Sequence, residues 1–86
     1  MELYKEIKNS FPEMEKLLSK KQLLKFKACS PTELYEYHFS FGRLIGNTYI
    51  WDKIHPLYNL FVESGVENTD HMISMMITLF HFHVNS

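Results

Sequence analysis

The stretch YHFSFGRLIGNTYIW, residues 37–51, decides what this chain of 86 residues can fold into. It holds five aromatic residues and a histidine, and Arg43 is its only charged residue. Such a concentration of aromatic side chains is typical of a hydrophobic core or of a surface that binds another protein. The preceding SPTE, residues 30–33, is a helix start: a serine cap, proline at the first helical position and glutamate at the third. We therefore expect a central helix from Ser30 to about Ile45, ended by Gly46.

This central helix is apolar around most of its circumference. Helical spacing gives one face of Leu34, His38, Phe41 and Ile45, and a second stripe of Tyr35, Phe39, Gly42 and Gly46. Only Glu33, Glu36, Ser40 and Arg43 look solvent-facing. Such a helix is central to the fold or covered by a partner. The following segment, 47–56, is expected to form a loop or a short extended stretch.

Helix signals continue on both sides. A first helix is expected to end near Asn9, and capping-box spacings at Ser10–Glu13 and Ser19–Gln22 start two more, the latter with Leu23, Leu24 and Phe26 inward. A helix through Leu57–Phe61 stops at Gly65, and the last runs from Asn68 or Thr69 to about His83. Its core stripe is Met72, Met76, Leu79 and Phe80.

No segment alternates with period two, so the sequence predicts an all-α fold, a compact single-domain bundle of about four to five short helices. Residues 1–28 would form basic N-terminal helices, and residues 30–86 an aromatic-rich helical core.

Charge is distributed unevenly along the chain. The net charge is −1, but residues 1–28 hold seven lysines and four glutamates, whereas residues 29–86 carry a balance of −4. The acidic remainder argues against direct nucleic-acid binding and favours a basic protein partner. The single cysteine, Cys29, excludes an internal disulfide and fits a reducing compartment. With no signal-like or membrane-length apolar segment in view, we expect a cytoplasmic protein without membrane contact.

The order of several residues resembles a small bacterial domain of unknown function, over about residues 34–85. The matching features are His38–Phe39, Gly42, Ile45, Asn47, Trp51, Ser64–Gly65, Asp70–His71–Met72, Ser74, Ile77, and the FHFH of residues 80–83 followed by Asn85. The resemblance implies no established chemistry or cofactor. Members tend to carry an arginine before the asparagine, where this chain has Gly46, so a role for that arginine does not carry over. Proteins of this size and type often accompany toxins or defence systems.

The histidines give little support for catalysis or for a metal. His38 and His81 are the metal candidates, through a site assembled across helices, but a hydrogen-bonded structural role fits both better. Ser74, Thr78 and His81 share a stripe of the last helix, yet Ser74 and His81 lie about 10 Å apart along the axis, too far for proton transfer. We expect no cofactor and assign no catalytic residue. Because this stripe lacks lysine, arginine and glutamate, we expect the N-terminal helices or another chain to cover it.

We therefore expect a small non-enzymatic protein that binds another protein. Its most concrete version is an immunity-type inhibitor that occludes a basic toxin or defence effector. Arg43, Tyr49 and Trp51 would anchor the contact, with Glu33, Glu36 and Asp52 complementing the target. Whether Trp51 belongs to the core or to the interface stays open. The alternatives are a minimal histidine-dependent enzyme or metal protein, and a homo-oligomeric regulatory subunit such as a homodimer.

Overall fold

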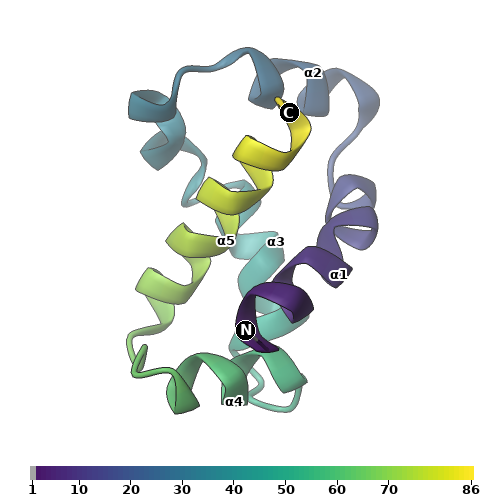
Figure 1. Cartoon of the computed structure of the whole chain (residues 1–86). Helices are drawn as coiled ribbons and strands as arrows, with labels where there is room; N and C mark the ends of the chain where they lie inside the picture. Colours follow the sequence, from purple (N-terminus) through teal and green to yellow (C-terminus); the bar gives the residue numbers. More distant parts are fainter. Residues whose placement is uncertain (1) are drawn as a thin grey trace.

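Helices make up all the regular structure of residues 2–86, the part of the chain that the computed structural model describes (Figure 1). The elements are α1 (Glu2–Lys16), α2 (Lys20–Ala28), the 3₁₀ helix η1 (Pro31–Tyr37), α3 (Phe41–Ile45), the π-helical η2 (Gly46–Ile50), α4 (Pro56–Glu63) and α5 (Thr69–Val84). Since α3 runs into η2 without a break, these form six helices. The all-α prediction is confirmed, and the predicted count of four to five is too low.

The N-terminal region forms one long helix where the sequence suggested two. Ser10 does not cap a new helix: it is buried in α1, and its hydroxyl donates to the Ile7 carbonyl at 2.6 Å. Pro12 interrupts the backbone ladder on the exposed side of α1, where water can take the place of the missing donor. The following α2 begins as predicted, since Ser19 and Gln22 form a reciprocal capping box. Phe26 of α2 is fully buried, but Leu24 is 66 % exposed, so its predicted inward position is wrong.

The predicted central helix is two helices joined by a break. Residues 31–37 form the 3₁₀ helix η1, residues 38–40 turn, and α3 starts at Phe41. A 3₁₀ helix has three residues per turn, so the facing predicted from 3.6-residue spacing is lost. Tyr35 and Phe39, expected in the apolar second stripe, are therefore exposed.

Gly46 does not end the helix. Its backbone is regularly helical (φ −59°, ψ −46°), and the chain continues through η2, where the Trp51 N–H donates to the Gly46 carbonyl at 2.8 Å. The reason for glycine here is contact with Trp51, because a Cβ on Gly46 would lie 2.5 Å from the indole. The segment expected to be a loop from residue 47 is therefore helical as far as Ile50.

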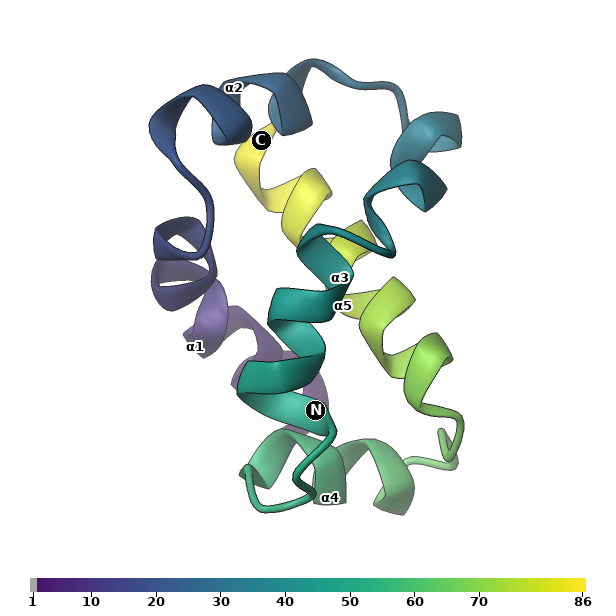
Figure 2. The same ribbon diagram turned by 180° about the vertical axis from the view of Figure 1, so that it is seen from behind.

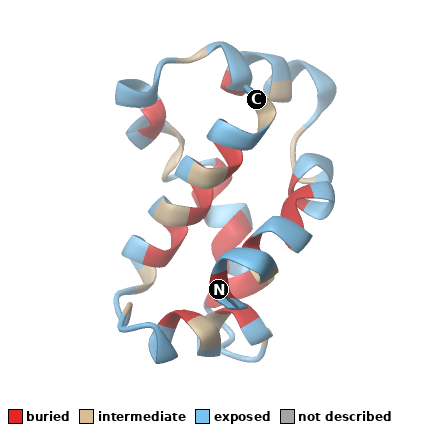
Figure 3. Cartoon of the chain, in the orientation of Figure 1, coloured by how far each residue is buried: buried red, intermediate tan, exposed pale blue. Residues whose placement is uncertain are grey.

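The core is one cluster that draws on every helix. The ring of Phe80 on α5 lies 5.6–5.7 Å, centroid to centroid, from the rings of Phe11, Phe26 and Phe41. Phe11 belongs to α1 and Phe26 to α2, so the basic N-terminal helices build the same core as residues 30–86. Figure 3 shows buried positions along both α1 and α5.

The last two helices are bounded as the sequence predicts. Gly65 follows α4 with φ +91°, a left-handed conformation that favours glycine. Asn68 caps α5 by accepting a hydrogen bond from the His71 N–H. Met72, Met76 and Phe80 are fully buried, and Leu79 is partly so. Within residues 2–86, no helix combines the length and apolarity that crossing a membrane requires.

Candidate functional site

One side of the α3–η2 helix is free of other helices. In Figure 2 this helix crosses the front of the molecule, and no other helix lies over it. Its exposed positions recur at helical spacing, and we call them the α3–η2 face: Arg43, Leu44, Asn47 and Trp51. The opposite side is buried against α4 and α5. The fold thus brings Arg43 and Trp51, eight residues apart, onto one surface.

Both of these side chains keep unused donors. Among residues 2–86 Arg43 forms no ion pair or side-chain hydrogen bond, and the Trp51 indole N–H has no acceptor. Trp51 is 42 % exposed, with one side of its ring on Gly46. Trp51 therefore lies neither wholly in the core nor wholly at the surface, because its indole contacts Gly46 while much of the side chain stays exposed.

A pocket of about 250 Å³ opens beside Arg43. We call it the α3 pocket. Its walls come from the end of η1, the turn at residues 38–40, α3 and the region around the beginning of α2. The lining residues are Leu18, Gln22, Tyr37, Phe39, Ser40, Phe41, Arg43 and Leu44. Phe39, 80 % exposed, stands at its rim. The α3–η2 face thus combines a cation, an indole and an apolar hollow.

Tyr49 does not belong to this surface, so its predicted place in the partner-binding set is wrong. The side chain is fully buried, and its hydroxyl donates to Glu13 Oε1 of α1 at 2.6 Å. Burial, together with the bonded Glu13 carboxylate, raises the pKa of the phenol well above its usual value. Because η2 continues the helix, Tyr49 falls on its inner side, four residues after Ile45.

The acidic residues expected around the anchors are exposed but dispersed. Glu33 and Glu36 lie on η1, and Asp52 follows Trp51. Glu33 accepts hydrogen bonds from the Ser30 N–H and hydroxyl, which lower the pKa of its carboxyl. Asp52 Oδ1 accepts from the Ile54 N–H. Of the three, Asp52 and Glu33 therefore also stabilise local turns, and only Asp52 directly adjoins an anchor.

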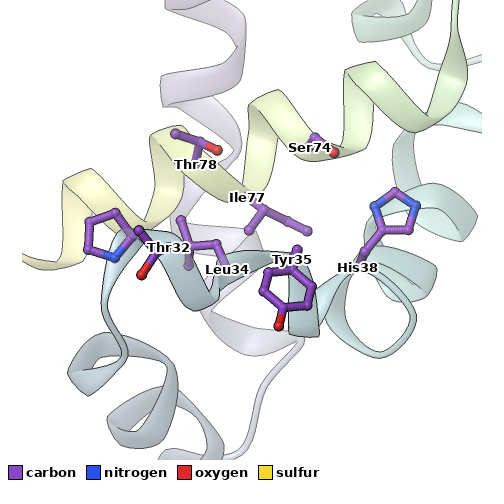
Figure 4. Close-up of a pocket in the computed structure, with 8 residues that line it drawn as sticks. Thr32, Leu34, Tyr35, His38, Ser74, Ile77 and Thr78 are labelled. Carbon is purple, nitrogen blue, oxygen red and sulfur yellow. The ribbon is translucent and has the colours of Figure 1, made fainter.

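A second concave site lies between η1 and α5, which we call the η1–α5 groove (Figure 4). It has a volume of about 250 Å³ and is lined by Pro31, Thr32, Leu34, Tyr35, His38, Ser74, Ile77 and Thr78. In Figure 4 Leu34 and Ile77 lie between the two helices, with Thr32 toward one end and His38 toward the other. His38 Nε2 lies 3.5 Å from Asp70 Oδ1. Among residues 2–86, no lysine or arginine lines the groove.

The uncharged stripe of α5 is only partly covered. His81 is buried under α2, where its Nε2 lies 2.9 Å from the Cys29 carbonyl oxygen. Ser74 and Thr78 are exposed, and they separate the groove from a second concavity of about 300 Å³, the α5 hollow, lined by His71, Ser74, Met75, Thr78 and Leu79. The N-terminal helices therefore cover His81 and leave Ser74 and Thr78 open.

His38 and His81 do not come together around a metal. His38 lies beside Asp70, eleven residues before His81 on α5, which separates the two histidines by about 16 Å along the axis. In residues 2–86 no group of three or more histidine, cysteine, aspartate or glutamate side chains is placed to hold a metal ion. Cys29 is partly buried, and burial with nearby Glu33 and Glu36 raises the pKa of its thiol, which disfavours the thiolate.

Two exposed features were not predicted from the sequence. Tyr35 and Phe39 are exposed although helical spacing predicts them in an apolar stripe, and Phe82 is 73 % exposed although no prediction places it at the surface. For Phe82 a signal existed, because it lies four residues after Thr78 and eight after Ser74 on the uncharged stripe. The exposure of Phe39 had no signal in the sequence, since residues 38–40, where the helix breaks, contain no glycine or proline.

Comparison with known proteins identifies a family but no activity. Neither curated proteins nor solved structures give a significant match. A family model described as a domain of unknown function, DUF6794, matches residues 5–84. The match extends from α1 to the end of α5, so the N-terminal helices are part of the family's domain, beyond the residues 34–85 that carried the resemblance. This chain belongs to the DUF6794 family.

Proposed function

We propose that this protein is a non-enzymatic binding module that acts by occluding another protein in the cytoplasm. The observation that supports it is the alignment of Arg43 and Trp51 on the open α3–η2 face, beside the α3 pocket. Arginine and tryptophan are the residue types most enriched at binding hot spots, because each joins a large contact area to a directed donor. Within residues 2–86 neither donor has a partner, and both side chains lie outside the hydrophobic core.

The most concrete version is an immunity-type inhibitor of a toxin or defence effector. Charge favours a basic target, since residues 29–86 carry a balance of −4 and Asp52 adjoins Trp51. In this version the Trp51 indole and an apolar side chain in the α3 pocket provide the buried contact, and the exposed carboxylates speed association and set its orientation. The mechanism is steric, so it requires no catalytic residue and no cofactor.

Binding is tested with Arg43→Ala/Trp51→Ala in a pull-down from lysate of the native host. A matched control is Tyr4→Ala/Lys8→Ala, which removes a half-exposed aromatic residue and a cation spaced four apart on α1. We expect one stoichiometric partner, retained by the wild type and the control and lost by the α3–η2 double variant, with helicity by circular dichroism unchanged. Retention of the partner by the double variant would assign binding to another surface.

A further inference from the structure

The exposed face of α2 carries a cluster of lysines around one leucine. At about 100° per residue, Lys20, Lys21, Lys25 and Lys27 all lie within about 100° of Leu24, two on each side of it. All five side chains are exposed, and Leu24 is 66 % exposed. We call this surface the α2 lysine face.

No negative charge offsets these lysines nearby in the chain. Residues 16–32 contain five lysines and neither aspartate nor glutamate. Phe26 of α2 packs against Phe80 and His81 of α5, and the chain after Asp70 contains no acidic side chain. Among residues 2–86, no lysine of α2 forms an ion pair. The lysines therefore create a positive potential at the end of the molecule where α2 lies (Figure 1).

The composition of the α2 lysine face selects among anionic partners. Its cations are all lysine, whereas protein interfaces are enriched in arginine and depleted of lysine. Arginine is also the residue that recognises nucleic-acid phosphates in a bidentate manner. Clustered lysines are typical of segments that bind anionic lipid through its overall surface charge. Leu24 favours lipid as well, because an apolar side chain among lysines can enter the boundary between headgroups and acyl chains.

From this chemistry we infer that the α2 lysine face binds the surface of an anionic bilayer. The axis of α2 lies parallel to the membrane, with the lysines among the headgroups and Leu24 inserted beneath them. Attachment is peripheral and reversible, since it needs no membrane-length apolar segment, the feature on which the expectation of no membrane contact depended. Gln22, which lines the α3 pocket, is on the opposite side of α2 from Leu24, so the lipid contact leaves that pocket open. The lipid contact does not depend on the proposed function.

The test is co-sedimentation with phosphatidylcholine vesicles that contain about 40 % phosphatidylglycerol, at about 50 mM salt. We expect the wild type to bind these vesicles, to release them as salt rises, and not to bind phosphatidylcholine alone. Lys20→Gln/Lys25→Gln should weaken binding at least about tenfold, because each lysine at an anionic surface contributes about fivefold. Lys5→Gln/Lys8→Gln removes the same charge from exposed positions of α1 and should bind like the wild type.

Fluorescence tests the insertion of residue 24. Leu24→Trp/Trp51→Phe has its only tryptophan at that position, and its emission should shift to the blue on the anionic vesicles and not on double-stranded DNA. Three results would overturn the inference: equal binding to neutral and anionic vesicles, equal binding by the two lysine variants, or no blue shift on anionic vesicles. Tighter binding to double-stranded DNA than to these vesicles would also overturn it, by assigning the α2 lysine face to nucleic acid.

Discussion

The two sides of the α3–η2 helix have similar residues and opposite roles. The inner side presents Phe41, Gly42, Ile45, Gly46, Tyr49 and Ile50, all buried. The outer side, with the turn before it, presents Phe39, Arg43, Leu44, Asn47 and Trp51, all exposed. Both sides contain rings, so hydrophobicity alone does not separate them. What separates them is the phase of the helix, set by the break at residues 38–40 and by the continuation through Gly46.

The largest difference is expected between two phenylalanines that stand two residues apart. Phe41→Ala removes a ring that packs against Phe26 and Phe80, and should lower the free energy of unfolding by about 3–5 kcal/mol. Phe39→Ala removes a ring that is 80 % exposed, so the free energy of unfolding should change by no more than about 0.5 kcal/mol. Urea unfolding followed by circular dichroism measures both. Equal losses would contradict the assignment of the two faces.

Tyr49→Phe tests the inner side with the ring retained. The hydroxyl bond to the Glu13 carboxylate should be worth about 1.5 kcal/mol, since bonds to charged groups exceed those between neutral ones. The raised pKa also predicts a pH dependence. The folded protein holds the phenolic proton more tightly than the unfolded chain, so this stabilisation is complete below about pH 10 and declines as pH rises above it.

The comparison is therefore made at alkaline pH. Between about pH 9 and pH 11 the unfolding free energy of the wild type should fall more steeply than that of Tyr49→Phe. Parallel curves would mean that Tyr49 does not keep its proton in the folded state. The other four tyrosines are common to both proteins, so they cancel in the difference.

The smallest expected effect concerns Gly46, where the two sides of the helix meet. In Gly46→Ala the new methyl displaces the Trp51 indole, and the gain in helix propensity offsets part of the lost contact, so the net change should be within about 1 kcal/mol. Tryptophan fluorescence should shift to the red as the indole becomes more exposed. In a Trp51→Ala background, Gly46→Ala should raise the free energy of unfolding by up to about 1 kcal/mol. Destabilisation there would show that the indole is not the contact that requires glycine.

Three local signals predict the structure correctly. The Ser19–Gln22 capping box, the Asn68 cap and Gly65 after α4 were all predictable, because each depends on residues at most four apart. The same reasoning failed at Ser10 and Gly46. Ser10 has the spacing of a cap, but it is buried within α1. Gly46 has the composition of a helix stop, but it serves the approach of Trp51.

For the candidate site, the sequence indicates residue types but not the contacts between distant segments. Residue type marks Arg43 and Trp51 as candidate anchors, and the helix that places both on one surface depends on residues 46–50 forming a π-helical turn. Tyr49 was misplaced because its partner, Glu13, is thirty-six residues away. The η1–α5 groove was not predictable, since it joins residues 31–38 to residues 74–78.

The sequence by itself determined the all-α class, most helix ends and an excess of rings around residues 37–51, because periodicity and capping act over one or two turns. Only the tertiary structure decided which rings are buried. The packing of α3–η2 against α4 and α5 placed Tyr49 inside and left Trp51 half outside, and that of α2 against α5 covered His81 but not Ser74 or Thr78. Burial is a property of contacts between distant segments, and these contacts override local preference when apolar area is at stake.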